Sequence, residues 1–270
     1  MLRPRITPCL LIDNGALVKT KVFDNPKYVG DPINAVKIFN EKEADELIVL
    51  DISATKNALN PNFSLIEKLA AECRMPLCYG GGVNSVKQVS QLIDMGVEKV
   101  AVSAAAIIEP TLINEMVTAV GSQSVVIVLD IYKKKSLLST RYQLCSHNSK
   151  KIYKEDPFSF FKKCQEAGAG EIIINSVNDD GLMQGYDLNL VSKIKSITKI
   201  PITFLGGVGS LKDIEELIQN FGIVGAAAGS LFVFKGKYRA VLINYPTFEE
   251  KIEICSKGMK VYNNIIESLK

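Results

Sequence analysis

The chain lacks the residues on which most metal sites depend. Its 270 residues include one histidine, His147, no tryptophan, and six cysteines without a CxxC pair. Zinc sites need several cysteine, histidine or carboxylate ligands at suitable spacing, so we expect no metal. Cys9, Cys73 and Cys164 stand among apolar neighbours, which is typical of small core residues in a reducing compartment. No sequence feature indicates a cofactor.

Long apolar runs and clustered charge are also missing. No stretch approaches the roughly 20 apolar residues of a membrane-spanning helix, and no signal peptide opens the sequence. The net charge is only +3, and the basic runs at 133–135 and 150–151 favour a solvated loop over a nucleic-acid patch. We therefore expect a cytoplasmic protein that neither enters a membrane nor binds nucleic acid.

The sequence does contain two similar glycine motifs. Tyr79-Gly80-Gly81-Gly82-Val83 and Leu205-Gly206-Gly207-Val208-Gly209 each end a short apolar run and precede a polar segment that starts a helix. Glycines between a strand and a helix expose backbone N–H groups at the positive end of the helix, where phosphates bind. The two motifs therefore predict a ligand with two phosphates.

Apolar runs and helical spacings alternate along the whole chain. Buried parallel strands read as continuous apolar runs, and amphipathic helices as apolar residues three or four apart. The predicted strands are 6–12, 47–51, 76–79, 100–102, 124–131, 171–174, 202–205 and 223–228; one predicted helix begins at Pro32, and others cover 63–73, 86–95, 110–119, 157–167, 187–197, 211–220 and 248–269. Eight strand–helix units predict a single α/β domain, a (β/α)8 TIM barrel over residues 1–270.

The two halves of the predicted barrel resemble each other. The stretch 44–49 is echoed by 169–174, and Gly96-Val97 is echoed by Gly222-Ile223. We interpret this as an internal half-barrel repeat, with halves at about 1–120 and 121–245 and a C-terminal helix to 270. Under this pairing strand one corresponds to strand five, which sets Leu11 against Asp130.

Two connections are longer than a barrel requires. Residues 13–31 are predicted as a long loop, either functional or mobile, that carries Lys19. That lysine is either a charge clamp over the barrel mouth or simply solvated. Residues 133–155 are polar with short β-prone pieces, which indicates a hairpin insert.

The active site of such a barrel lies at the C-terminal ends of its strands. Asp51 and Asp130 each end a strongly apolar strand, where partial burial suits a carboxyl to acid–base work; for Asp51 a helix-capping role is equally compatible. The residues expected to hold phosphate are Gly81, Gly82 and Ser103 in one half and Gly207, Gly229 and Ser230 in the other. Other candidates at strand ends are Asp13, Asn175 and Asp180.

Charged residues of alternating sign stand at the opposite ends of the strands. They are Arg5, Glu46, Lys99 and Glu171, at the N-terminal ends of strands one, two, four and six. Such residues would ring the bottom of the barrel as ion pairs. The residue types alone favour an ordinary stabilising role.

Several fragments in register point to a known family. They are Arg5 with Pro8-Cys9-Leu10, Gly30-Asp31-Pro32, Asp45-Glu46-Leu47 with Leu50-Asp51-Ile52, the first glycine motif, Gly121-Ser122-Gln123 to Asp130, Gly168-Ala169-Gly170-Glu171-Ile172, Asp180-Gly181 with Gly185-Tyr186-Asp187, and Gly206-Gly207. In these fragments the chain resembles HisF, the cyclase subunit of imidazole glycerol phosphate synthase. The resemblance covers nearly the whole chain.

The resemblance implies a function and a partner. The family's enzyme takes ammonia from a glutaminase, HisH, at the N-terminal face of the barrel. It then passes the ammonia through the barrel to a bis-phosphorylated aminoimidazole-carboxamide ribonucleotide. The resemblance implies that Arg5, Glu46, Lys99 and Glu171 gate the ammonia. It also implies that Asp130 is one of two catalytic aspartates.

The chain departs from the family at the second aspartate. Leu11 stands where that residue is expected, and leucine neither gives nor takes a proton. Asp13, two residues on, would replace it only if the following loop bent back. Ser103-Ala104 also stands where the family usually has Asn-Thr. These departures resemble HisF-like paralogues of surface-polysaccharide pathways, which help form an amidine (acetamidino) group on a nucleotide-activated sugar.

Three hypotheses therefore stand. The first is an ammonia-channelling, lyase- or cyclase-type synthase subunit of a glutamine amidotransferase complex in glycan assembly, with a HisH-like glutaminase and possible help from a third, amidotransferase-type enzyme. The second is a histidine-pathway cyclase that tolerates Leu11. The third is a barrel without turnover of its own that only conducts ammonia.

Overall fold

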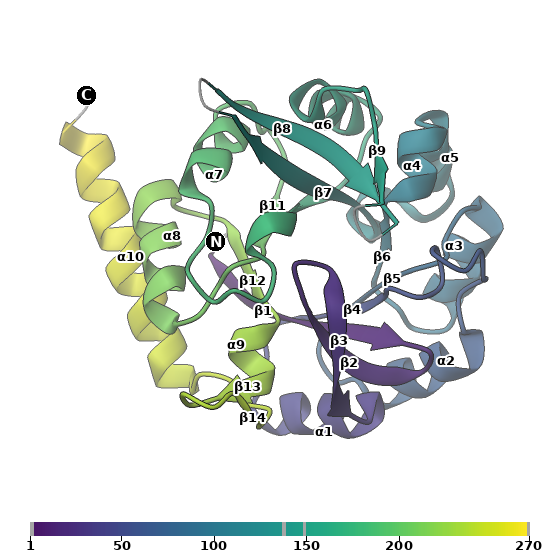
Figure 1. The fold of residues 1–270 in the computed structure, drawn as a ribbon, viewed down its shortest axis with the longest axis horizontal. Coiled ribbons are helices and arrows are strands. Elements are labelled where there is room, and N and C mark those ends of the chain that lie inside the picture. Colours follow the sequence, from purple (N-terminus) through teal and green to yellow (C-terminus); the bar gives the residue numbers. More distant parts are fainter. Residues whose placement is uncertain (1–2, 137–138, 148–149, 269–270) are drawn as a thin grey trace.

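Eight parallel strands close into a barrel with helices around it, as the sequence predicts. The computed structural model describes residues 3–136, 139–147 and 150–268. The neighbour order is β10-β11-β12-β1-β4-β5-β6-β7, and β7 pairs with β10 to close the ring (Figure 1). The barrel strands are β1 (Arg5–Asp13), β4 (Leu47–Asp51), β5 (Leu77–Gly80), β6 (Lys99–Val102), β7 (Val125–Lys135), β10 (Glu171–Ser176), β11 (Ile202–Leu205) and β12 (Gly225–Ala228).

Alternation along the strands separates two apolar cores. On β4, Leu47 and Val49 point outward and pack beneath the helices, whereas Ile48 points into the barrel. The buried interior set is Cys9, Ile48, Cys78, Ala101, Val126, Val128, Ile173, Leu205 and Ala227. Because both faces of every strand are covered, the strands can be apolar almost throughout, which is why they stand out in the sequence.

Side-chain caps explain where most of the helices begin. Asp31, Asn62, Ser85, Asp156, Asp187 and Ser210 each accept a hydrogen bond from a backbone N–H of the helix that they precede. The helices are α1 (Pro32–Glu41), α2 (Phe63–Glu72), α3 (Val86–Asp94), α5 (Thr111–Val120), α6 (Pro157–Glu166), α7 (Leu188–Lys195), α8 (Leu211–Phe221) and α10 (Phe248–Ser268), with 3-10 turns at Ser122–Ser124 and Val177–Asp179.

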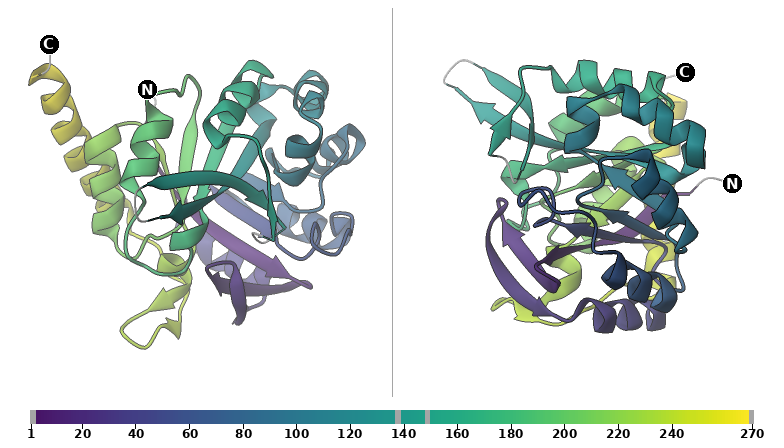
Figure 2. Two further views of the ribbon diagram at one scale, coloured as in Figure 1. Left: turned by 45° about the horizontal axis from the view of Figure 1, so that its top comes forward. Right: turned by 90° about the vertical axis from the view of Figure 1, so that its right-hand side faces the viewer.

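Two hairpins rise from the same end of the barrel. β2 (Ala16–Lys21) and β3 (Asp24–Gly30) fold back on β1, and β7 continues beyond the barrel to pair with β8 (Thr140–Ser146), which pairs with β9 (Lys151–Ile152). Both project away from the chain termini (Figure 2). The second confirms the predicted insert, apart from residues 137–138 and 148–149, which lie outside the described residues. The first corrects the predicted loop, since residues 16–30 are a paired hairpin.

Short elements escaped the sequence analysis. Helix α4 (Ala104–Ile108) follows β6, and helix α9 (Ser230–Val233) follows β12. A small hairpin, β13 (Phe234–Lys235) with β14 (Ala240–Val241), comes next. These elements are too short for helical or strand periodicity to reveal them. The two short helices occupy matching places in the two halves, but the duplication itself stays a prediction.

The C-terminal segment packs against the outside of the barrel near its N-terminal end. The Tyr245 hydroxyl donates to the Ile6 carbonyl at 2.6 Å, and the Lys251 ammonium on α10 binds the Asp45 carboxylate at 3.0 Å. Helix α10 packs along α8 (Figure 1). No helix in the described part of the chain combines the length and apolar character needed to cross a membrane.

Candidate active site

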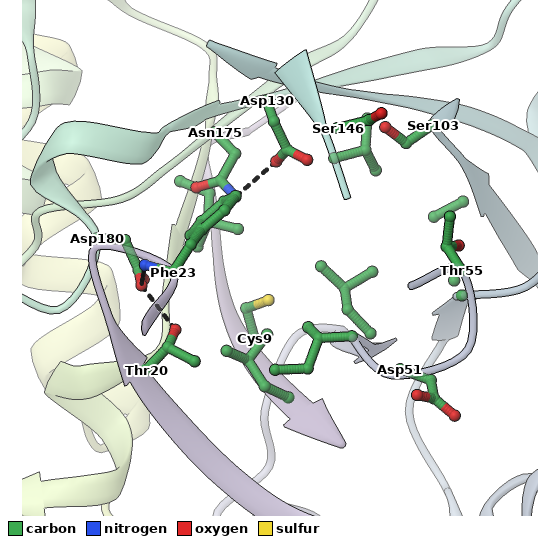
Figure 3. A pocket seen from close by; sticks show the side chains of 18 of the residues that line it. Cys9, Thr20, Phe23, Asp51, Thr55, Ser103, Asp130, Ser146, Asn175 and Asp180 are labelled. Carbon is green, nitrogen blue, oxygen red and sulfur yellow. Dashed lines mark hydrogen bonds between the residues drawn. The ribbon is translucent and has the colours of Figure 1, made fainter. Parts of the chain in front are cut away.

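One pocket of about 370 Å³ occupies the C-terminal ends of the strands. It brings together most of the residues expected at the barrel mouth. Those that line it are Lys19, Asp51, Gly81, Gly82, Ser103, Asp130, Asn175, Asp180, Gly207, Gly229 and Ser230. Asp13 is absent from the lining. The arrangement is seen in Figure 3, where side chains from opposite strands converge on one opening.

Asp130 is the pocket carboxyl best suited to proton transfer. It ends the barrel part of β7, and one of its oxygens accepts a hydrogen bond of 3.0 Å from the Asn175 amide on β10 (Figure 3). Burial raises the pKa of the Asp130 carboxyl to about 7; the Asn175 hydrogen bond lowers it in part, and the nearby Asp180 charge adds to the rise. A carboxyl with a pKa near neutrality can act as either acid or base.

Leu11 stands across the mouth from Asp130. Strands β1 and β7 are separated by three strands in either direction around the ring, so their ends face each other. Leu11 lines the pocket. Asp13 lies in the pair between β1 and β2, opposite Ala16, and its carboxylate accepts from the exposed Asn14 side chain at 3.0 Å. The hairpin therefore does not bring the Asp13 carboxylate into the pocket.

Asp51 has a local structural role that the sequence left open. One carboxylate oxygen accepts from the Ser53 N–H at 2.9 Å, the Ser53 hydroxyl at 2.7 Å and the Ala54 N–H at 3.0 Å. In Figure 3 its carboxylate points away from the centre of the opening. These bonds fix the turn after β4. Asp51 therefore has the capping role that the sequence allowed, but it caps a turn and not a helix.

The two glycine motifs make close backbone turns at the pocket. Gly81 and Gly207 have positive φ angles of 122° and 98°. A Cβ at Gly81 would lie 2.4 Å from the Asp51 carbonyl oxygen, and one at Gly207 would lie 2.0 Å from the Gly185 carbonyl oxygen. Only glycine fits either position without displacing backbone.

A serine accompanies each glycine turn. The hydroxyl oxygens of Ser103 and Ser230 are buried and have no hydrogen-bond partner among the described residues. They follow β6 and β12, which are also separated by three strands in either direction around the ring. The pocket thus carries two unpaired hydroxyls on opposite walls, each beside a bare glycine backbone. Buried polar groups without partners are expected where a polar ligand binds.

Lys19 is buried and ion-paired rather than solvated. It is 6% exposed, and its ammonium binds the Asp180 carboxylate at 2.5 Å. The other Asp180 oxygen accepts from the Thr20 hydroxyl at 2.7 Å (Figure 3) and from the Phe23 N–H at 3.3 Å. A Cβ at Gly229 would lie 3.0 Å from the Lys19 Cε atom. The hairpin therefore holds a cation beside the second glycine–serine pair.

Several residues that line the pocket were not expected. Thr20 and Phe23 come from the β2–β3 hairpin, Thr55 and Lys56 from the turn after β4, and Ser146 and His147 from the end of β8. None lies at the end of a barrel strand. For the four hairpin residues the only signal in the sequence is that they occur in connections longer than a barrel needs; Thr55 and Lys56 carry no signal.

The four charged residues at the other end form a closed ring of ion pairs. Arg5 binds Glu46 at 3.1 Å and Glu171 at 2.6 Å. Lys99 binds the same two carboxylates at 2.5 and 2.8 Å. Burial acts to lower the Lys99 pKa, but the charges of Glu171 and Glu46 outweigh it and raise that pKa. Burial likewise acts to raise the Glu171 pKa, but the charges of Arg5 and Lys99 outweigh it and lower that pKa.

Between ring and pocket the barrel interior is small, apolar and uncharged. Cys9, Ala101, Val128 and Leu205 belong to the interior core and also line the pocket. Cys78 lies in the same core, where burial and the charges of Glu46 and Glu171 raise the pKa of its thiol well above the ordinary value. These interior side chains therefore link the two ends without placing a charge between them.

Comparison with known proteins agrees with this architecture. The family model of the histidine biosynthesis proteins matches residues 5–239. The chain belongs to this family. A relative from Leptospira interrogans, provisionally named imidazole glycerol phosphate synthase subunit HisF, is 55% identical over 251 residues, which cover 93% of this chain and 98% of the relative.

Two other relatives extend the comparison. A protein from Vibrio vulnificus, provisionally named imidazole glycerol phosphate synthase subunit hisF3, is 51% identical over 93% of this chain and 96% of its own length. Imidazole glycerol phosphate synthase subunit HisF from Petrotoga mobilis is 38% identical over 89% of this chain and 94% of its own length. Within the family this chain is therefore HisF-like.

Proposed function

We propose that this HisF-like barrel is a synthase subunit that receives ammonia at its N-terminal end and adds it to a phosphorylated substrate at its mouth. A HisH-like glutaminase would bind over the charged ring. This path for ammonia is supported by the order of three features along the barrel axis, which are the charged ring, the uncharged interior and the pocket. Ammonia is small and neutral, so an apolar interior accepts it, whereas ammonium would lose its hydration there.

The glycine turns and the two serines are the features that favour a phosphorylated substrate. Gly81–Gly82 with Ser103, and Gly207 with Gly229–Ser230, supply backbone and hydroxyl donors on opposite walls. Lys19 adds a cation beside the second set. Phosphate oxygens are met by such donors. Two anionic groups held on opposite walls would centre the substrate between Leu11 and Asp130.

Leu11 is the observation that favours amidine formation over the histidine-pathway reaction. A cyclisation that needs two facing aspartates has only Asp130 here. We propose that ammonia instead replaces the carbonyl oxygen of an acetamido group on a nucleotide-activated sugar, as in surface-polysaccharide assembly. A C–N bond forms, the C–O bond breaks, and water leaves. A third, amidotransferase-type enzyme is compatible with this reaction.

The second candidate is the cyclase subunit of histidine biosynthesis. It is favoured by the 38% identity to the Petrotoga mobilis HisF protein and by the two opposite glycine–serine pairs. A barrel that only conducts ammonia would bind a glutaminase yet show no turnover in any assay.

The decisive experiment restores the missing carboxylate. The purified protein and its Leu11→Asp variant are given ammonium salt and the bis-phosphorylated histidine-pathway intermediate, and imidazole glycerol phosphate is measured. We expect turnover by the variant to exceed the residual rate of the wild type by at least about 100-fold, since one acid–base partner typically contributes that much. Leu11→Asn is the matched control, because asparagine is polar and of the same size as aspartate but does not transfer protons near neutral pH.

A companion measurement tests the sugar. Surface polysaccharide from host cells that lack this chain is compared by mass spectrometry with that from cells that carry it. Loss of an amidine substituent in the deletion strain is the expected result. Robust turnover of the histidine-pathway intermediate by the wild type, with unchanged polysaccharide, would instead establish the second candidate.

A further inference from the structure

The end of β8 places a chain of three hydrogen-bonding side chains at the pocket. The Ser146 hydroxyl lies 2.7 Å from Nδ1 of His147 and 2.8 Å from the Tyr153 hydroxyl. Ser146 is only 2% exposed, and both Ser146 and His147 line the pocket. In the view of Figure 3, Ser146 lies between Asp130 and Ser103 on the rim.

The strand register keeps this group beside Asp130. Strand β8 runs antiparallel to β7 and pairs Cys145 with Asp130. Ser146 and His147 are therefore the next residues as the chain returns towards the barrel. The backbone of Tyr153 is fixed to β8, since its N–H donates to the Leu144 carbonyl at 2.9 Å. The group is therefore anchored to β8, the strand that pairs with the Asp130 strand β7.

His147 adopts an unusual backbone conformation. Its φ angle is 54°, in the left-handed region that costs a residue with a side chain roughly 1 kcal/mol or more. Strained conformations of this kind collect at functional sites, where surrounding structure maintains them. Here the strain accompanies a ring whose Nδ1 is engaged by Ser146, whereas its Nε2 makes no hydrogen bond to any of the described residues.

We propose that His147 is the second acid–base group of this pocket, partnered with Asp130 in place of a carboxylate at position 11. The assignment rests on the proposed function, which makes this pocket the reaction site. As ammonia forms its bond to carbon, the nitrogen becomes positive and loses a proton to Nε2 of His147. The departing oxygen takes one proton from the Asp130 carboxyl and a second from the protonated His147 ring, so it leaves as water; the product is an amidinium ion, and His147 returns to its neutral form.

Ser146 and Tyr153 are positioning residues that suit the ring to both roles. When Tyr153 donates to Ser146 and Ser146 donates to Nδ1, the proton of the neutral ring sits on Nε2. When the hydrogen bonds run the other way, Nδ1 carries the proton and Nε2 is a base. A hydroxyl both donates and accepts, so the chain reverses without moving a heavy atom.

The first test needs no substrate. His147 is the only histidine of the 270 residues, so protein labelled with ¹⁵N-histidine and freed of any tag gives ring signals from this residue alone. We expect Ser146→Ala and Tyr153→Phe to shift the ring nitrogen signals and change the tautomer ratio. Tyr142→Phe is the matched control, because Tyr142 lies on β8 but bonds Asp187 instead. If the His147 ring signals were unchanged in Ser146→Ala, the proposed series of hydrogen bonds from Tyr153 through Ser146 to His147 would be overturned.

The second test measures turnover. His147→Gln and Asp130→Asn are compared in whichever reaction the wild type performs, product from the bis-phosphorylated intermediate with ammonium or amidine content of the polysaccharide. We expect each to lose about 100-fold or more. With the purified enzyme we also expect KM to change little and added imidazole to restore part of the rate of His147→Gln.

The outcomes separate this inference from the proposed function. Loss in Asp130→Asn with full turnover in His147→Gln would overturn the role of His147 and leave the pocket as the reaction site. Full turnover in both variants would overturn both proposals. A wild type that performs neither reaction would also overturn both.

Discussion

Asp130 combines two properties that normally oppose each other. It ends an apolar strand, so its surroundings favour the neutral carboxyl, yet it faces a pocket that is also lined by the charged residues Lys19 and Asp180. Burial brings its pKa to about 7. A carboxyl in this range exchanges protons with ammonia-derived groups at neutral pH without a metal ligand or a strong base beside it.

The raised pKa of Asp130 predicts how stability depends on pH. The unfolded chain releases this proton near pH 4, and the folded protein near pH 7. The unfolded state therefore gains stability first, and the free energy of unfolding falls as pH rises from about 4 through 7. Below pH 4 both states are protonated and no loss arises; above 7 the loss is complete.

The comparison with Asp130→Asn measures this loss, since asparagine does not ionise. We expect the variant to gain roughly 1–2 kcal/mol relative to the wild type between pH 5 and pH 8, less than the full linkage because the pocket is open to water. Urea titrations at the two pH values check it. An Asp94→Asn variant on α3 serves as control. A pH-independent difference between Asp130→Asn and the wild type would contradict the raised pKa.

Strand ends revealed part of the pocket in the sequence, but not all of it. Asp130 and Asn175 were predictable because an apolar run delivers its last polar residue to the mouth. Ser146 and His147 were not, because they reach the pocket on a hairpin whose pairing with β7 is a tertiary fact. Asp13 was misplaced for the same reason, since the β2 pairing carries it away from the opening.

At the scale of elements, the β2–β3 hairpin depends on one carboxylate. Asp180 binds the Lys19 ammonium, the Thr20 hydroxyl and the Phe23 N–H, and its carbonyl accepts from the Val22 N–H at 2.9 Å. All four hairpin groups belong to residues 19–23, where the hairpin turns. The carboxylate thus fixes both the position of the hairpin and the orientation of its lysine.

Asp180→Asn should therefore loosen the hairpin and leave a buried lysine without its counter-charge. We expect a loss of about 3 kcal/mol in unfolding free energy, together with faster amide hydrogen exchange across residues 16–30. Asp24→Asn is the matched control, because Asp24 lies on the same hairpin but accepts only from the neighbouring Asn25 N–H at 2.8 Å. Equal exchange in the two variants would argue against the anchor.

Element prediction succeeded where burial gave a period and failed where pairing alone defines structure. The barrel strands and the long helices carry continuous or three-to-four spacing that survives in the sequence. The β2–β3 hairpin has exposed residues on its second strand and turns with positive φ at Val22, Phe23 and Asn25. Such turns have no glycine signature here, so residues 13–31 looked like a loop.

At the scale of the molecule, the barrel separates a ring of charges at one end from a pocket at the other. The ring of Arg5, Glu46, Lys99 and Glu171 closes the bottom, and Asp130 faces the pocket at the top. Buried ion pairs are a poor source of stability, so a closed ring of four charges needs a further reason. Under the proposed function, an entrance that admits neutral ammonia and excludes ions is one such reason.

Removing one cation from the ring tests that reason. In Lys99→Met the stem of the side chain is kept, but two carboxylates must share Arg5, which we expect to cost about 3 kcal/mol. The barrel should remain folded by circular dichroism. With the glutaminase bound, glutamine consumed per product formed should rise severalfold, whereas turnover with added ammonium salt should stay within about twofold, because the pocket is untouched.

Lys195→Met supplies the matched comparison, because Lys195 is also half-buried but lies on the outer helix α7 and donates to the Ile223 carbonyl at 3.3 Å. It should leave the glutamine-to-product ratio unchanged. If Lys99→Met also left that ratio unchanged, the ring would be a structural feature only. A ratio that rises in Lys99→Met alone, with ammonium-driven turnover intact, requires that ammonia pass the ring on its way to the mouth.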